Sequence, residues 1–133
     1  MKIVIDTNVV ISAALGSKTC TKALLKASHE DIIVPRLITE ELKRFLAKVE
    51  SAKKIDKNKL TELHNFFQYF INLSIITKDY SLYSYSDDLP DNHFLSVASH
   101  HRAYLIIGDL KCQKIAKENE IMCYSPAQYI TLS

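Results

Sequence analysis

Short, largely apolar runs alternate along this chain with longer segments whose apolar residues recur at helical spacing. The runs lie at residues 2–5, 32–34, 73–76, 104–107 and 121–124. An apolar run of this length is expected for a strand buried on both faces. Strands that alternate with helices pair in parallel through right-handed crossovers. The sequence therefore predicts an α/β protein, a three-layer α/β/α sandwich with a central parallel sheet of about five strands.

The segments between these runs are expected to be helical. The two clearest helices carry apolar stripes at three-and-four spacing, formed by Ile38, Leu42, Phe45, Leu46 and Val49 and by Leu60, Leu63, Phe67, Phe70 and Ile71. Further helices are expected at 7–15, at about 19–28 with Thr19 or Thr21 as cap, from Asp88 onward, and at 111–119, with a polar loop at 78–89. No repeat or linker divides the 133 residues, so one domain spanning residues 1–133 is expected.

Composition and cysteine content limit the class of protein. Hydrophobic residues make up 47% of the chain and charged residues 24%, which excludes a disordered or membrane-spanning chain. The apolar runs are far shorter than the roughly 20 residues that cross a bilayer. Met1 leads directly into the first run, which leaves no room for a signal peptide. A cytoplasmic protein without a membrane partner is expected, and Cys20, Cys112 and Cys123, which form no CxxC pair, are expected to be free, buried thiols.

Two acidic residues come at the ends of predicted strands. Asp6 follows the first run directly, and Asp109 follows the 104–107 run after Gly108. In open parallel sheets, ligands bind beyond the carboxyl ends of the strands, where the strand order reverses. Either aspartate alone is more often a helix cap than a catalytic group. The two together favour a functional site at this edge of the sheet.

Glu41 and Asp91 each have a structural and a functional interpretation. On a helical wheel, Glu40 points away from the apolar stripe, while Glu41 lies on its flank at the edge of the core. A carboxylate there needs a partner, which is either a lysine or a bound cation. Asp91 is expected in the first turn of a helix, where it meets the helix dipole. It shares a face with Leu95 and Ala98, however, and so projects toward the strand ends.

The residues that other chemistries need are missing or scattered. Gly16 and Gly108 are the only glycines, so the chain has neither a GxGxxG turn nor a P-loop, and it also lacks the GxSxG and HExxH motifs. Each histidine is expected to be an ordinary surface or partly buried imidazole, although His93 is close enough to Asp91 to contact a substrate. The histidines are His29, His64, His93, His100 and His101.

Four motifs, taken together, resemble those of the PIN domain family. The opening Ile3-Val4-Ile5-Asp6-Thr7-Asn8-Val9-Val10-Ile11-Ser12-Ala13 is similar to the start of that family. Glu41-Leu42 with Phe45-Leu46, Asp88-Leu89-Pro90-Asp91-Asn92 with Phe94-Leu95, and Ile107-Gly108-Asp109 follow in the family's order. The resemblance spans nearly the whole chain. It implies a parallel sheet with helices on both faces and a metal-dependent ribonuclease.

The resemblance also implies the site residues and the cofactor. The acidic quartet that holds Mg²⁺ or Mn²⁺ would be Asp6, Glu41, Asp91 and Asp109, supported by Asn8 and Ser12. Carboxylate oxygens suit these hard cations, whereas zinc prefers Cys and His ligands. The chain departs from the family pattern at Lys111, where many members carry an acid or polar residue, and at Ile107, where they carry Thr or Ser. The number of bound ions is therefore left open.

A chain this short, without an added RNA-binding domain, resembles the toxin component of bacterial toxin–antitoxin pairs, including the VapC-like group. That resemblance implies an RNA substrate, a small protein antitoxin and a homodimer. Lys53, Lys54 and Lys57 are expected either to contact RNA phosphates or to form a solvated face. Three tyrosines of the polar loop, Tyr80, Tyr83 and Tyr85, either stack on bases or anchor the loop to the core.

Two other classes of function remain open from the sequence. Haloacid-dehalogenase-like phosphoryl transfer also begins with a strand that ends in Asp, but it expects a second Asp two positions later, where this chain has Asn8. A non-catalytic RNA-binding or regulatory module with a degenerate acidic pocket is favoured by Lys111 and opposed by the retention of all four acids. Cleavage of RNA with Mg²⁺, Mn²⁺ and EDTA separates these alternatives.

Overall fold

A computed structural model describes residues 1–132 and contains one five-stranded parallel sheet. Its strands are β1 (Lys2–Ile5), β2 (Asp31–Pro35), β3 (Ile75–Thr77), β4 (Tyr104–Ile106) and β5 (Cys123–Tyr124), in the order β3-β2-β1-β4-β5. All four strand pairs are parallel. The predicted α/β fold with a parallel sheet flanked by helices is confirmed.

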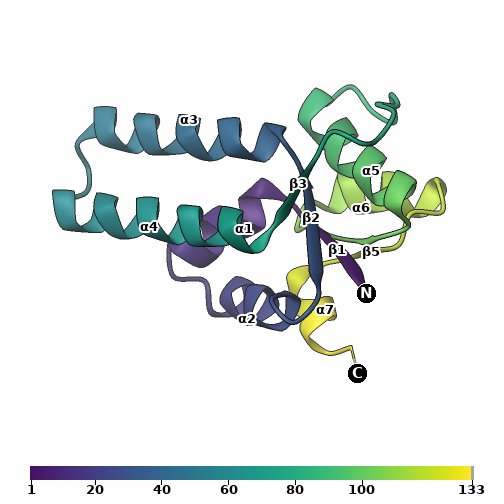
Figure 1. Ribbon diagram of the computed structural model, residues 1–133, viewed down its shortest axis with the longest axis horizontal. Coiled ribbons are helices and arrows are strands. Elements are labelled where there is room, and N and C mark those ends of the chain that lie inside the picture. The colour runs from purple at the N-terminus through teal and green to yellow at the C-terminus, as the bar shows by residue number, and fades with distance from the viewer. Residues whose placement is uncertain (133) are drawn as a thin grey trace.

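Helices cover both faces of the sheet (Figure 1). They are α1 (Thr7–Ala14), α2 (Lys18–Ala27), α3 (Leu37–Ala52), α4 (Lys57–Leu73), α5 (Leu89–His101), α6 (Leu110–Glu118) and α7 (Pro126–Ile130). The connections from β1 to β2 and from β2 to β3 carry α1 to α4 across one face. The returning connection to β4 runs in the opposite direction, so right-handed crossovers place α5 and α6 on the other face. Helix α5 accordingly packs on β1, β2 and β4.

The strand order reverses between β1 and β4, which are neighbours in the sheet. Ile3 pairs with Tyr104 and Ile5 with Ile106, and the backbone N–H of Asp6 extends the pairing by donating to the carbonyl of Ile106 at 3.1 Å. From this point the chain turns toward β2 on one side and toward β5 on the other. Such a switch point opens a crevice beyond the carboxyl ends of the two strands.

The core explains why the apolar runs become strands. Three-residue stretches of β1 and β2, from Ile3 to Ile5 and from Ile32 to Val34, are buried on both faces. All three cysteines are free, as predicted; Cys112 and Cys123 are buried, whereas Cys20 is only partly buried, where a buried thiol was expected. Within the part of the chain that the structure describes, no helix has both the length and the apolar composition needed to cross a bilayer.

Three local details differ from the sequence-based expectation. Ser17, rather than Thr19 or Thr21, caps α2, because its hydroxyl accepts from the backbone N–H of Cys20. Helix α4 continues through Leu73, so β3 begins only at Ile75. Helix α7 was not expected, because five residues are too few to show a helical period. None of these differences changes the elements on which the acidic residues were expected to lie.

Candidate active site

Asp6 lies at the carboxyl end of β1 and begins the site. Its side chain is only 6% exposed, and it caps α1 by accepting from the backbone N–H of Asn8 at 3.1 Å. Burial raises the pKa of this carboxyl from 3.8 to about 7; the Asn8 hydrogen bond opposes the rise, and the nearby charges of Asp91 and Glu41 add to it. Asp6 is therefore both a helix cap and an acid held in an unfavourable electrostatic environment.

Asp91 lies in the first turn of α5, and its carboxyl interacts electrostatically with other acids of the site. Asp88 caps the helix and accepts from the backbone N–H of Asp91 at 3.0 Å. The pKa of Asp91 is raised to about 6, mainly by partial burial. The negative charges of Asp88, Asp109 and Glu41 raise it further, and the positive charge of Lys111 lowers it. Two other members of the quartet, Asp109 and Glu41, therefore raise the pKa of Asp91, and Lys111 opposes them.

Glu41 comes to the site from α3, on the opposite face of the sheet from α5. Its carboxylate accepts a 2.6 Å hydrogen bond from the hydroxyl of Thr7, the residue after Asp6. Glu41 is partly buried and Glu40 is exposed, so the helical wheel identified the inward glutamate correctly. The partner of Glu41 is a buried threonine, whereas the sequence interpretation considered a lysine or a cation.

Asp109 caps α6, accepting from the backbone N–H groups of Lys111 at 2.8 Å and Cys112 at 3.3 Å. It is exposed. Asp6 and Asp109 line one hollow of about 170 Å³ at the ends of the neighbouring strands β1 and β4, and the expected supporting residues Asn8 and Ser12 line it too. Both aspartates are therefore helix caps, and both also line the same hollow, so the two roles are compatible.

The ligand atoms at this edge of the sheet are carboxylate oxygens. Each of the four acids is close enough to at least one other to raise a pKa. The nearby thiol of Cys112 is buried, and burial together with the charge of Asp91 raises its pKa strongly, so it stays protonated and is a poor metal ligand. The donor set fits a hard divalent cation such as Mg²⁺ or Mn²⁺ and lacks the Cys and His ligands that zinc prefers.

Three buried polar residues that sequence reasoning did not single out position these acids. Thr7 holds Glu41. Asn92 accepts from the backbone N–H groups of residues 85 and 86 and donates to the carbonyl of residue 86, which fixes the loop before Asp91. Gln113 donates to the carbonyl of Ile107 at 2.8 Å, just before Asp109. Thr7 and Asn92 each follow an acid directly in the motifs quoted above, and this position next to an acid could have identified them from the sequence.

Basic side chains also approach the site. Arg44 and Lys48, one and two turns beyond Glu41 on α3, line a hollow of about 210 Å³ together with Glu41 and Thr7. Lys53 ends α3, twelve residues and about 18 Å along the helix axis from Glu41. Lys54 and Lys57 follow in the turn and the start of α4. The contact of these three lysines with RNA stays a prediction.

The polar loop before α5 is attached to the helix through side chains. The hydroxyl of Tyr80 and Nδ1 of His93 are 2.7 Å apart, so His93 is engaged with the loop. The backbone N–H of Tyr83 donates to the hydroxyl of Ser96 at 2.9 Å. The Tyr83 ring is exposed and lies 4.9 Å from that of Tyr85. Tyr80 and Tyr85 are partly buried against the core, so both fit the anchoring alternative.

This arrangement defines a class of parallel α/β proteins with an acidic site at the strand switch point. The sequence matches the family model of the PIN domain over residues 2–109. The chain therefore belongs to the PIN domain family, as its motifs predicted.

Two solved structures share the fold over nearly the whole chain. VapBC2 from Rickettsia felis, solved bound to a DNA fragment from its promoter, matches with a TM-score of 0.66 at 14% identity and covers 94% of this chain and 98% of that chain. FitAcB from Neisseria gonorrhoeae matches with a TM-score of 0.67 at 19% identity, covering 93% of this chain and 97% of that chain. At these identities the likeness concerns the fold. No curated protein matches the sequence.

Proposed function

We propose that this chain is a Mg²⁺- or Mn²⁺-dependent endoribonuclease and the toxin of a type II toxin–antitoxin pair. The observation that carries the proposal is that the pKa values of Asp6 and Asp91 are raised, first by burial and then by neighbouring acids: Asp91 and Glu41 act on Asp6, and Asp109 and Glu41 act on Asp91. Keeping several acids ionised together is unfavourable unless a cation joins them. In a family of nucleases, a group of acids whose ionisation is unfavourable without a cation is best explained as a metal site.

Asp6, Glu41, Asp91 and Asp109 would hold the ion. Bound Mg²⁺ or Mn²⁺ would orient the scissile phosphate, activate a water and neutralise charge on the leaving oxygen. Within residues 1–132, the only three metal-capable side chains with ligand atoms mutually within 4.8 Å belong to Asp79, His100 and His101. The four acids are spaced more widely, which suits Mg²⁺, because that ion keeps several of its waters.

The remaining residues of the site would position the acids and the RNA. Thr7 orients Glu41 through its hydroxyl, and Asn8 and Ser12 add polar groups to the hollow beside Asp6. Arg44 and Lys48 place two positive charges beside Glu41, where they would meet the phosphates that flank the cleaved bond. No protein nucleophile is required by this arrangement.

The proposal includes a small protein antitoxin, a homodimer, a cytoplasmic location and a single nuclease domain over residues 1–133. It rests on the resemblance to VapC-like toxins and on the fold shared with VapBC2. An apolar hollow of about 120 Å³ between α2 and α4 supports a protein partner. Leu25 and Tyr69, which line it, are 63% and 68% exposed, more than an isolated chain needs to show.

RNA cleavage with a matched pair of variants tests the nuclease. Wild type should cleave RNA with Mg²⁺ or Mn²⁺ and stop when EDTA is added. Glu41→Gln should abolish cleavage, while Glu40→Gln, one position away and exposed, should leave it nearly intact. Equal loss in both variants would contradict the assignment of Glu41. RNA binding without cleavage under any metal would instead make the chain a non-catalytic module, the alternative that Lys111 favours.

A further inference from the structure

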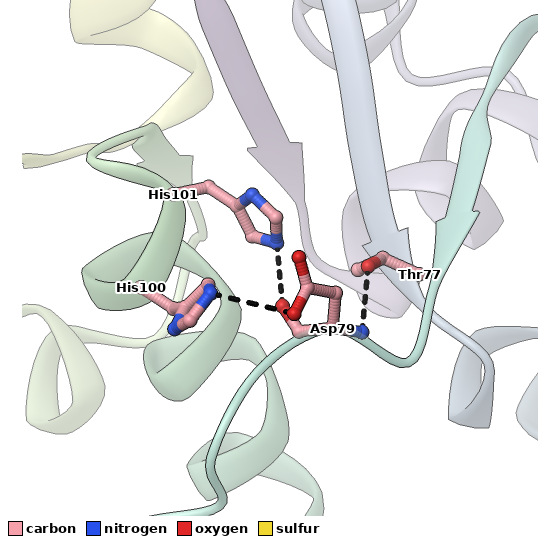
Figure 2. A network of polar contacts seen from close by, with 4 residues as sticks. All are labelled: Thr77, Asp79, His100 and His101. Atoms are coloured by element: carbon pink, nitrogen blue, oxygen red, sulfur yellow. Dashed lines mark hydrogen bonds and ion pairs between the residues drawn. The ribbon is translucent and has the colours of Figure 1, made fainter.

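A second group of potential metal ligands lies outside the acidic quartet. Asp79 comes two residues after β3, the edge strand of the sheet, and His100 and His101 are the last two residues of α5. Their ligand atoms all lie within 4.8 Å of one another, a closeness that no other trio in residues 1–132 reaches. Figure 2 shows both imidazoles turned toward Asp79 from the end of the helix.

The contacts within this group converge on one residue. Nε2 of His100 lies 3.7 Å from Oδ1 of Asp79, and Nε2 of His101 lies 2.9 Å from the backbone carbonyl oxygen of Asp79. The backbone N–H of Asp79 donates to the hydroxyl of Thr77 at 3.0 Å, and Thr77 is buried. Asp79 is thereby fixed to the end of β3 while its oxygens face the two imidazoles.

We propose that Asp79, His100 and His101 bind Zn²⁺. Two imidazole nitrogens and one carboxylate oxygen are a common three-ligand set for zinc, which takes water in the fourth position. Ligand atoms around a tetrahedral zinc are about 3.3 Å apart, so the 3.7 Å pair needs only a small contraction. Because a carbonyl oxygen only accepts, Nε2 of His101 carries the proton in its contact with Asp79. Zinc takes the place of that proton, so this hydrogen bond breaks when His101 binds the ion through Nε2 and Nδ1 becomes the protonated nitrogen.

Charge and ligand type separate this site from the quartet. The end of a helix carries a partial negative charge, which favours a cation beside His100 and His101. Imidazole ligands favour zinc over Mg²⁺, whereas carboxylate and water ligands suit Mg²⁺. The two sites of this chain therefore take different ions and can be occupied together.

The position of the site gives it a structural consequence. A bound ion joins the chain at residue 79 to the chain at residue 100 and so closes the segment that contains the polar loop and α5. That segment carries Asp91. Zinc is therefore expected to stabilise the fold around one acid of the quartet without touching the substrate, because an ion that binds only the folded state stabilises it by mass action.

Zinc binding is tested by isothermal titration calorimetry of the full chain in excess Mg²⁺, so that the quartet is already occupied. His100→Gln and Asp79→Asn should each weaken Zn²⁺ binding at least about 10-fold, since changes even beyond the ligands cost that much. Both residues are exposed, so both variants are expected to fold, which circular dichroism checks. His64→Gln, at an exposed histidine of α4, is the matched control and should bind as wild type does.

A second measurement locates the ion. In histidine-ring ¹⁵N spectra, Zn²⁺ should shift the nitrogens of His100 and His101 and leave those of His29 and His64 in place. The Asp6→Asn variant should retain both the shift and the affinity. Unchanged binding in His100→Gln and Asp79→Asn would overturn the proposal, and so would loss of zinc binding in Asp6→Asn, because the ion would then lie in the quartet.

Discussion

The hydroxyl of Thr7 donates a 2.6 Å hydrogen bond to the carboxylate of Glu41, across 34 positions of sequence. Thr7 is buried at the start of α1, directly after Asp6, and Glu41 lies on α3. The bond therefore fixes the position of the glutamate relative to the aspartate at the end of β1. Two acids from distant elements are held in register by a residue that is neither acidic nor a metal ligand.

Thr7→Val should reduce metal-dependent cleavage by about 10- to 100-fold, the usual effect of removing a group that orients a metal ligand. Valine keeps the shape of threonine but leaves the carboxylate of Glu41 without its donor. Thr7→Ser keeps the hydroxyl and should restore most of the activity. Initial rates at saturating Mn²⁺ measure the effect. Equal rates for the valine and serine variants would show that the hydrogen bond does not matter for cleavage.

The stability of the metal-free protein should fall as the pH rises from about 4 to about 7. The pKa of Asp6 is raised from 3.8 to about 7 and that of Asp91 to about 6, so the folded state binds protons more tightly than the unfolded state. The stabilisation from protonation is complete below pH 3.8 and is lost as the pH passes through the folded pKa values. Asp6 contributes at most about 1.4 kcal/mol per pH unit.

Urea denaturation in EDTA at a series of pH values measures this dependence. Saturating Mg²⁺ should flatten it near neutral pH, because the ion favours the ionised carboxyls. Glu40→Gln serves as the control, since Glu40 is exposed, and should leave the profile unchanged. Stability that rises from pH 4 to 7 would contradict the raised pKa values of Asp6 and Asp91.

Asp6→Asn should leave the metal-free protein at least as stable as wild type while abolishing cleavage and the Mg²⁺-induced rise in melting temperature. Asparagine caps a helix about as well as aspartate, and it carries no charge to bury. Asp6→Ala removes the cap as well and should be less stable than Asp6→Asn by about 1 kcal/mol. Differential scanning fluorimetry with and without Mg²⁺ compares the two variants. A large destabilisation in Asp6→Asn would make Asp6 a structural residue.

The double variant Arg44→Ala with Lys48→Ala should weaken RNA binding and its salt dependence. Each lost phosphate contact reduces the slope of log affinity against log salt by about 0.7 for a single strand, so the slope should fall by about 1.4. Fluorescence anisotropy in EDTA measures binding without cleavage. Replacing Lys53, Lys54 and Lys57 by alanine is the comparison. A larger effect there would move the RNA path toward the turn between α3 and α4.

Lys111→Met should tighten Mn²⁺ binding by roughly twofold to fivefold, the size expected for one surface charge. The ammonium group of Lys111 lowers the pKa of Asp91, which means that it partly neutralises the charge available to a cation. Lys114→Met, an exposed change on the same helix, is the control. Melting temperature as a function of Mn²⁺ at pH 8 gives the affinities. Identical curves for the two variants would show that Lys111 does not act on the site.

The strands and the positions of the acids at their ends followed from the sequence because both depend on local pattern. Short runs that are apolar at successive positions are typical of a sheet covered on both sides, and parallel strands bring Asp6 and Asp109 to the same edge. Helix α7 was too short for periodicity, but it carries the Ser125 and Gln128 capping box and a proline at its start. Those residues were a readable signal that a search for periodicity overlooks.

Contacts between side chains of distant elements could not be predicted from the sequence. Nothing local joins Thr7 to Glu41 or Asp79 to His100, since each pair meets only after separate elements pack. The two adjacent histidines were expected to be ordinary imidazoles because no metal-binding spacing includes them. Their convergence on Asp79 depends on the packing that brings the segment after β3 against the last turn of α5.

The capping role of Asp6 also bears on how this protein can lose its function. A single change to asparagine keeps the hydrogen bond to the start of α1 and relieves a buried charge, so the fold places no barrier against it. Under the proposed function, a copy with asparagine at residue 6 would fold but would not cleave RNA. A survey of natural variants would then find asparagine at this position in intact, well-packed chains, and the identity of residue 6 would distinguish working copies from silent ones.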